Sequence, residues 1–513
     1  MNKVDIVFAA VIALLLVAAM AMTCSGAWPE ETAPPQPTSN TPASASEPAD
    51  APRFEPGPCQ VQVPSTYQVA CGMLIVPEDR SRPGGATLRL PVAVFHSPNP
   101  DAAPDPVIHL VGGPGGDLLG AAGFYLGAGG DDILAHRDYI LFNQRGTHGA
   151  EPALECPGMA EFTRALGQEP LAWPARQARE LEFLLGCQET LVARGANLAA
   201  YNSAENAADV ADLRLALGYE QVNLYGISYG TRLALTVMRD HPQGVRSVIL
   251  DSVYLPQVDL DETLAANAHR AFQTLFEGCA SDVYCRSHYP DLEAVFYRTV
   301  DALNTEPVKV QVQGSTVDAW LDGDILMSAV FGTLYRTDAI PWLPTMIYQA
   351  SQGNYEPLRT PLEAMLDAGG ISTGMHYALQ CREEVAFESY HETVDLAADL
   401  PPQVAAHYAS SQVFDLCAAW GAGAAPPVEN EPVASSIPTL VVSGQYDPIT
   451  PPDWGRLAAG TLDHSFFFEF PGVGHGVIRS SDCGRQIGRQ FLADPTERPD
   501  DACLDDLQGP TFH

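Results

Sequence analysis

Short apolar runs alternate along this chain with longer segments in which apolar residues recur at the spacing of a helix. The runs predict β-strands at 87–95, 106–111, 139–143, 221–225, 245–250, 437–443 and 465–470. Helical spacing between them predicts helices at 204–218 and 231–240. Strands that alternate with helices are typical of an α/β fold, with a largely parallel sheet and helices on both of its faces.

This alternation is interrupted between about residues 260 and 433, where the pattern is mainly helical. Helices are expected there at 264–279, 292–304, 324–334 and 361–367. Because the strand pattern resumes afterwards, we interpret 260–433 as a helical cap domain inserted into a sheet domain. The two parts of that sheet domain are 59–259 and 434–513.

The first 58 residues precede the predicted folded part. Lys3 is followed by an apolar run that extends to about Met22, which is the pattern of a signal peptide over residues 1–27. Two alternatives remain open: a lipoprotein signal acylated at Cys24, and an uncleaved membrane anchor. Residues 28–58 are rich in Pro, Ala and Ser, so we expect a disordered tether. These features predict a periplasmic or secreted protein, attached to a membrane only if Cys24 is lipidated.

Composition narrows the classes of partner. The 513 residues include 63 acidic and 27 basic side chains, which gives a formal net charge of −36. A nucleic-acid-binding protein needs a basic surface, so this charge argues against that class, and it also disfavours docking on anionic lipid. A well-solvated secreted protein fits the composition.

Cysteine usage agrees with export. The chain has 11 cysteines, and cleavage after Ala27 removes Cys24 and leaves an even number. We expect bridges that close short loops, namely Cys59–Cys71, Cys156–Cys187, Cys279–Cys285, Cys381–Cys417 and Cys483–Cys503. Metal binding is the other use of clustered cysteines, but the sequence has no Cys-x-x-Cys motif.

A candidate nucleophile lies in Gly226-Ile227-Ser228-Tyr229-Gly230, directly after the strand predicted at 221–225. The spacing Gly-x-Ser-x-Gly is that of a nucleophile elbow, a sharp turn from strand to helix. The serine takes a strained backbone conformation in this turn, and the flanking glycines avoid collisions with the neighbouring strand and helix. The pattern is short enough to arise by chance, so it needs support from elsewhere in the chain.

A serine hydroxyl needs a base, and the base needs a third group that orients it. After an elbow of this kind the expected order is serine, acid, histidine. Asp447 follows the strand predicted at 437–443, and His475 follows the strand predicted at 465–470. Either residue alone would more often be part of a turn, but the series at strand ends predicts a triad of Ser228, Asp447 and His475.

The loop after the strand at 106–111 reads Gly112-Gly113-Pro114-Gly115-Gly116. Glycines let backbone N–H groups approach a substrate oxygen, so we assign the oxyanion hole to the amides of Gly113 and Tyr229. A phosphate-binding loop is disfavoured because no Gly-Lys-Ser/Thr follows. This chemistry needs no metal ion and no organic cofactor.

Together these motifs resemble the α/β-hydrolase peptidases, most closely the proline iminopeptidases and the bacterial secreted tripeptidyl aminopeptidases. The resemblance covers about residues 61–503 and is carried by the glycine-rich loop, the elbow, Asn143-Gln144-Arg145-Gly146-Thr147, Gly444-x-x-Asp447-x-x-Thr450-Pro451 and Gly474-His475-Gly476. Residues 434–513 would correspond to the C-terminal region of the tripeptidyl aminopeptidases. The family usually has His, Asp and Ser where this chain has Val111, Asn143 and Ala150, and these departures concern the support of the oxyanion loop.

The resemblance implies the α/β-hydrolase fold and an exported serine hydrolase that cleaves short peptides near a free N-terminus through an acyl-enzyme. Such an enzyme must recognise an ammonium group. Glu383 in the cap is the candidate, because family members carry an acidic residue just after a cysteine that matches Cys381. A carboxylesterase or lipase on the same scaffold is the first alternative, and a non-catalytic surface binding protein is the second.

Overall fold

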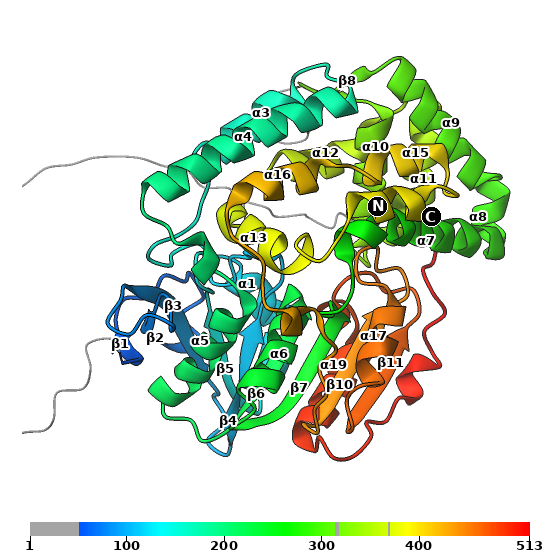
Figure 1. Ribbon diagram of the computed structural model, residues 1–513. Helices are drawn as coiled ribbons and strands as arrows, with labels where there is room; N and C mark the ends of the chain where they lie inside the picture. Colours follow the sequence, from blue (N-terminus) through cyan, green and yellow to red (C-terminus); the bar gives the residue numbers. More distant parts are fainter. Residues whose placement is uncertain (1–50, 313–317, 368–369) are drawn as a thin grey trace, which may run out of the picture. The chain divides into compact units, whose positions relative to one another are not determined.

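The computed structural model describes residues 51–312, 318–367 and 370–513, and its centre is a nine-stranded sheet (Figure 1). The strand order is β1-β2-β3-β5-β4-β6-β7-β10-β11. The strands are β1 (Arg53–Pro56), β2 (Gln68–Pro77), β3 (Thr87–His96), β4 (Ala103–Leu110), β5 (Arg137–Phe142), β6 (Val222–Ser228), β7 (Val245–Val253), β10 (Thr439–Gly444) and β11 (Ser465–Phe470). From β5 to β11 neighbouring strands pair in parallel, whereas β1, β2 and β3 extend the β5 edge with antiparallel pairs. The predicted largely parallel sheet is confirmed.

The sheet is buried on both faces, and alternate residues of a strand enter different cores. In β6, Leu224 belongs to one core and Tyr225 to the other. The first core is covered by α5 (Ser203–Ala216), α6 (Tyr229–Asp240) and α17 (Pro452–Ala459). The second is covered by α1 (Ala122–Tyr125), α2 (Asp131–Leu134), α18 (Val477–Ser480) and α19 (Asp482–Ala493). Burial on both faces explains why these strands read as nearly continuous apolar runs.

The start of the folded part differs from the prediction. Strand β1 falls within the tether predicted at 28–58, yet it pairs with β2, which was not among the predicted strands. The ring of Phe54 packs where Gly72 has no side chain, since a Cβ on that glycine would lie 2.6 Å from the ring. Short strands flanked by proline are weak sequence signals, and this one depends on its partner strand. The signal peptide, Cys24 and the tether up to residue 50 lie outside the described residues.

The cap has a core of its own. Its four predicted helices are present as α7 (Leu260–Ser281), α9 (Leu292–Thr305), α10 (Gly323–Leu334) and α12 (Arg359–Leu366). The cap also contains elements that were not predicted: α8 (Val283–His288), α11 (Leu343–Ser351), α13 (Thr373–Leu379), α14 (Tyr390–Ala397), α15 (Pro402–Tyr408), α16 (Gln412–Trp420), and a hairpin of β8 (Val308–Gln311) and β9 (Asp318–Leu321).

Two further helices lie beside the cap helices although they precede them in sequence (Figure 1). They are α3 (Met159–Gly167) and α4 (Trp173–Ala193). Helix α4 packs against α13 and α16, and Gln188 donates a hydrogen bond to the Trp420 carbonyl at 3.0 Å. Helices α3 and α4, which lie within the predicted sheet-domain range 59–259, thus pack beside helices of the predicted cap, while Leu184 and Leu191 of α4 share a core with the sheet. The boundary at 259 stays a prediction.

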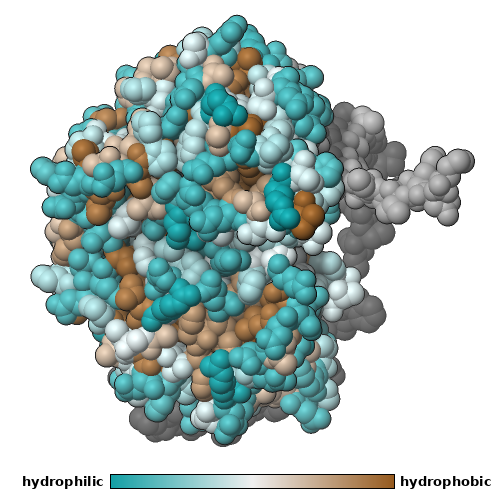
Figure 2. All heavy atoms as spheres, turned by 90° about the vertical axis from the view of Figure 1, so that its right-hand side faces the viewer, coloured by the Kyte–Doolittle hydropathy of each residue, from teal (hydrophilic) through white to brown (hydrophobic). Residues whose placement is uncertain are grey.

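Five disulfides join the cysteines in the predicted pairs: Cys59–Cys71, Cys156–Cys187, Cys279–Cys285, Cys381–Cys417 and Cys483–Cys503. Among the described residues, no helix is long and apolar enough to cross a membrane. On the face shown in Figure 2, hydrophilic residues dominate and apolar ones form small separate patches. This surface agrees with the solvated protein that the composition indicates.

Candidate active site

The elbow has the strained geometry that its sequence predicts. Strand β6 ends at Ser228, which has φ 57° and ψ −129°, and α6 begins at the next residue. A Cβ on Gly226 would lie 2.4 Å from the carbonyl oxygen of Gly230, and one on Gly230 would lie 1.8 Å from the carbonyl oxygen of Leu110. Both contacts are with backbone atoms that side-chain motion cannot relieve. The turn therefore requires glycine on each side of the serine.

The predicted acid and base are in contact. Asp447 follows β10, His475 follows β11, and Nδ1 of the imidazole lies 2.8 Å from Oδ2 of the carboxylate. Asp447 Oδ1 accepts hydrogen bonds from the backbone N–H groups of Ile449 and Thr450, at 3.1 and 3.0 Å, and Oδ2 accepts one from the Thr450 hydroxyl at 2.7 Å. Burial alone would raise the pKa of Asp447, but His475 and these donors hold it below its ordinary value. The carboxylate is thus charged and fixed in orientation.

The segment 474–478, called the histidine loop below, lies beside the elbow. A Cβ on Gly476 would come within 2.9 Å of the Ile227 side chain. In the described part of the chain, no hydrogen bond joins the Ser228 hydroxyl to His475. Such contacts are often long in serine hydrolases without ligand and tighten when substrate binds. The structure brings Asp447 and His475 together and puts their loop next to the nucleophile, while the contact of Ser228 with His475 stays a prediction.

The glycine-rich loop packs directly on the nucleophile. A Cβ on Gly112 would lie 2.6 Å from Cβ of Ser228. Gly113 has φ 124°, which favours glycine, and no hydrogen bond from its amide to another described residue is found. Tyr229 is the first residue of α6, so its N–H has no acceptor within the helix. Gly113 follows Gly112, which packs on Ser228, and Tyr229 follows Ser228 in the chain; the role of their two amides in an oxyanion hole stays a prediction.

The segment Asn143-Gln144-Arg145-Gly146 supports the glycine-rich loop and the residues after it through hydrogen bonds. Gln144 donates to the Val111 carbonyl at 3.1 Å. Asn143 accepts from the Leu119 N–H at 3.0 Å and donates to Asp117 at 2.8 Å. An amide does both tasks, whereas a carboxylate at this position would face the carboxylate of Asp117. The presence of Asn143, where the family usually has aspartate, is therefore compatible with the carboxylate of Asp117, to which it donates a hydrogen bond.

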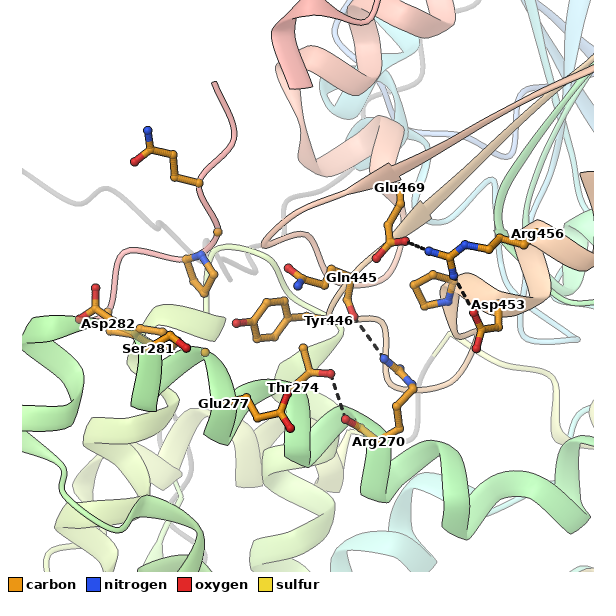
Figure 3. Close-up of a pocket in the computed structure, with 16 residues that line it drawn as sticks. Arg270, Thr274, Glu277, Ser281, Asp282, Gln445, Tyr446, Asp453, Arg456 and Glu469 are labelled. Atoms are coloured by element: carbon orange, nitrogen blue, oxygen red, sulfur yellow. Dashed lines mark hydrogen bonds and ion pairs between the residues drawn. The ribbon is translucent and has the colours of Figure 1, made fainter. Parts of the chain in front are cut away.

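The cap contacts both catalytic loops. The carbonyl of Tyr335, just after α10, accepts the His475 N–H at 3.1 Å, and the two rings lie 4.9 Å apart. Arg270 of α7 donates to the carbonyl oxygens of Gln445 and Asp447. Figure 3 shows Arg270 reaching from the cap helix to this loop, beside a cavity of about 670 Å³. Nothing in the local sequence pattern marks Tyr335 and Arg270 as contacts between the cap and the sheet domain, so neither residue was predicted.

Glu383 is buried, at 1% exposure, in a π-helical turn that follows α13. Its two carboxylate oxygens accept hydrogen bonds from the N–H and the hydroxyl of Ser203, at 2.5 and 2.6 Å, and Arg232 lies 3.4 Å away. The same Ser203 hydroxyl is 2.9 Å from the hydroxyl of Tyr229. These partners tie Glu383 to the helices next to the nucleophile, and its predicted contact with a substrate ammonium group stays a prediction.

Further carboxylates gather close to Glu383. Glu384 pairs with Arg232, and Glu388 accepts a hydrogen bond from the backbone N–H of Asp261 at 3.0 Å. Burial and the nearby negative charge of Asp261 raise the pKa of Glu388. Its Oε2 is buried and has no hydrogen-bond partner among the described residues. Within the same part of the chain, no group of His, Cys, Asp and Glu is arranged to hold a metal ion.

Comparison with known proteins agrees with this geometry. A family model described as the alpha/beta hydrolase fold matches residues 105–478. Serine protease Hip1 of Mycobacterium tuberculosis is 26% identical to this chain over 539 residues, which covers 96% of each protein. Carboxylesterase B of the same species is 28% identical over 487 residues, covering 88% of this chain and 90% of the relative. Tripeptidyl aminopeptidase of Streptomyces lividans is 29% identical over 212 residues, covering 38% of this chain and 39% of the relative.

The family match extends over more than half of the chain. It includes the elbow at Ser228 and the contact between Asp447 and His475. The chain belongs to the alpha/beta hydrolase fold family.

Proposed function

We propose that this protein is an exported serine peptidase that cleaves short peptides near a free N-terminus. The observation that carries the proposal is the buried pair of Asp447 and His475, held beside an elbow that strains Ser228. Peptide rather than ester cleavage is supported by the similarity to serine protease Hip1 along nearly the whole chain and to tripeptidyl aminopeptidase along part of it.

The reaction follows the roles of a serine triad. His475 accepts the proton of Ser228 while the hydroxyl attacks the scissile carbonyl, and Asp447 stabilises the imidazolium that forms. The amides of Gly113 and Tyr229 donate hydrogen bonds to the oxyanion. His475 then protonates the leaving amine, which leaves an acyl-enzyme. A water molecule, deprotonated by the same imidazole, attacks the ester carbonyl and releases the acyl product and free Ser228.

Export is part of the proposal. Five disulfides form and persist in oxidising compartments, and the N-terminal sequence has the pattern of a signal peptide. Expression with and without residues 1–27, followed by fractionation and mass spectrometry of the mature N-terminus, tests this step. A mature chain that begins at Trp28 supports cleavage after Ala27, and one that begins with a lipidated Cys24 supports an anchor. An unprocessed protein in the cytoplasm contradicts export.

The reaction class is tested with matched peptide arylamides whose N-termini are free or acylated. We expect the free peptides to be cleaved faster, and Ser228→Ala to lower turnover by several orders of magnitude. Labelling by a fluorophosphonate, absent in Ser228→Ala, identifies the nucleophile. Turnover that survives the loss of Ser228, or equal cleavage of both peptide series, contradicts the proposal.

The carboxylesterase alternative has one observation in its favour, the similarity to carboxylesterase B over 88% of this chain. A triad by itself does not separate esters from amides. Short-chain nitrophenyl esters are therefore assayed beside the arylamides. Ester hydrolysis without any amide hydrolysis would favour this second candidate.

The ammonium site is tested by comparing two glutamates. Glu383→Gln is expected to raise KM for free peptides and to leave KM for acylated ones unchanged, because only the former carry the charge. Glu388→Gln is the comparator, since Oε2 of Glu388 has no hydrogen-bond partner among the residues that the structure describes, whereas both oxygens of Glu383 have one. If KM changes only in Glu388→Gln, the ammonium group binds at the Asp261–Glu388 pair, and the role of Glu383 is rejected.

A further inference from the structure

The backbone of the histidine loop is held at every position by atoms from outside the loop. Its first two N–H groups are accepted by the cap, at the Thr337 hydroxyl and the Tyr335 carbonyl, 3.0 and 3.1 Å away. Its last three are accepted by two consecutive residues at the end of β7. Ser252 Oγ accepts from Gly476 at 2.8 Å, and the two oxygens of Asp251 accept from Val477 and Ile478, at 2.7 and 3.0 Å.

Asp251 is an unusual residue for its surroundings. It is fully buried, and burial raises the pKa of its carboxyl group. Besides the two N–H groups of the histidine loop, it accepts a hydrogen bond from the Tyr225 hydroxyl at 3.0 Å. The positive charge of Arg479 lowers the pKa of Asp251 and so partly offsets the effect of burial. The same guanidinium donates a hydrogen bond to the His475 carbonyl at 2.9 Å. A buried carboxylate is costly unless such donors compensate it. The Ser252 hydroxyl is a further donor at 3.5 Å, so two of the four hydrogen bonds that Asp251 accepts come from the segment that carries His475.

Ser252 adds a second unusual feature. It is one of three non-glycine residues with positive φ among the described residues, at φ 59°, and Ser228 is another. A conformation of this kind costs on the order of 1–3 kcal/mol and persists where the surroundings over-determine it. The fully buried Ser252 side chain points to the Gly476 N–H, one residue from the catalytic imidazole. The strain therefore places an acceptor where the histidine loop needs one.

The sheet connects this pair to the nucleophile. In the parallel ladder of β6 and β7, Asp251 is the partner of Ile227, the residue that directly precedes Ser228. The register shifts at the next pair, where Ser228 is the partner of Val253 and Ser252 is left without a partner in the ladder. The ladder therefore places both acceptors of the histidine loop beside the end of the strand that carries the nucleophile. A shift of the histidine loop against the elbow requires these hydrogen bonds to break.

From this arrangement we propose that Asp251 and Ser252 are positioning residues, which set the imidazole of His475 against the Ser228 hydroxyl. The inference rests on the proposed function only in needing Ser228 and His475 to react as nucleophile and base. It does not depend on whether the substrate is a peptide or an ester. Neither residue touches the reacting atoms, so substrate binding should not require them.

The test compares Asp251→Ala, Asp251→Asn and Ser252→Gly with wild-type protein. The measurements are the rate of fluorophosphonate labelling per folded molecule, and kcat and KM on whichever substrate the wild type cleaves. A displacement of about 1 Å costs on the order of 100-fold in rate, so we expect a fall of about 10- to 100-fold in labelling and in kcat. KM should change by less than about twofold, because the change affects reactivity and not binding.

The two substitutions at Asp251 should lower the labelling rate and kcat to different extents. Asparagine keeps one acceptor oxygen and turns the other position into a donor, so Asp251→Asn should be less impaired than Asp251→Ala. Ser252→Gly relieves the positive φ while it removes the hydroxyl. A purely structural role would then leave its labelling rate at the wild-type value or raise it, whereas positioning predicts a slower one.

Asp105→Asn is the matched control. Asp105 is also a buried carboxylate with several donors, including Asn223 and Arg137, but it lies at the amino end of the central strand β4, whereas Asp251 lies near the carboxyl end of β7. We expect this variant to lose thermal stability and to label at the wild-type rate. If Asp251→Ala does not fold, Ser252→Gly decides the question by itself. Wild-type labelling rates per folded molecule in both Asp251→Asn and Ser252→Gly would overturn the proposal.

Discussion

Replacement of Asp447 by asparagine isolates the orienting role of the triad acid. The introduced amide has one allowed orientation, because the Oδ1 position faces the N–H groups of Ile449 and Thr450 and must remain an acceptor. The NH2 group therefore takes the place of Oδ2 and donates to Nδ1 of His475, 2.8 Å away in the wild type. The imidazole then carries its proton on Nε2, the nitrogen that should accept the proton of Ser228.

The size of the effect follows from this change of tautomer. In other triad hydrolases the equivalent substitution lowers kcat by about 10⁴-fold, which corresponds to about 5.5 kcal/mol of transition-state stabilisation. The Thr450 hydroxyl, which donates to Oδ2, can rotate and accept from the new NH2 group, so we expect the fold to be retained. The assay is kcat on the best substrate together with thermal unfolding. A folded Asp447→Asn protein with more than about one tenth of wild-type kcat would refute the assigned roles.

Three further predictions concern stability. Gly230→Ala should lower the free energy of unfolding by more than about 3 kcal/mol or prevent folding, because its Cβ would lie 1.8 Å from a backbone oxygen. Gly186→Ala, in open space on α4, should raise the free energy of unfolding by about 0.5–1 kcal/mol, measured by urea unfolding. Replacing both Cys381 and Cys417, which are 36 positions apart, with serine should lower the free energy of unfolding by about 4 kcal/mol in the same assay. This value would be contradicted if a reductant destabilised the variant and the wild type equally. Glu388 has a raised pKa, so the folded state keeps a proton that the unfolded chain loses above about pH 4.5. The stability of the wild type should therefore fall as pH rises. Glu388→Gln removes this group, so its Tm should fall less steeply from pH 5 to pH 8 than that of the wild type.

The sheet and the elbow could be predicted because their signals are local. The strands are buried on both faces and read as apolar runs, and the strain at Ser228 requires glycines two positions away on either side. The contact of Asp447 with His475 could also be predicted from the sequence, because both residues follow strands whose carboxyl ends lie on the same side of the sheet. In each case a short stretch of sequence carries the whole physical requirement.

Contacts between distant segments could not be read from the sequence. Glu383 binds Ser203, 180 positions away, and nothing near either residue marks that pairing. Asp251 lies near the end of the apolar strand β7, and its sequence context resembles that of an ordinary turn residue until its contacts with the histidine loop are known. Helix α4 has the apolar spacing of any helix, and that spacing does not indicate that it packs against α16, more than 200 positions later in the chain. These features depend on tertiary packing, which periodicity does not encode.

The order of the disulfides along the chain has a consequence for biogenesis. Each bridge, from Cys59–Cys71 to Cys483–Cys503, is complete before the next one begins, so none of the five loops encloses or crosses another. A polypeptide that emerges from a translocation channel with its N-terminus first could therefore oxidise its thiols strictly in pairs, as each couple appears. Such a chain never needs to hold an early cysteine in reserve for a late partner, and it has little need of an isomerase to correct mismatched bonds.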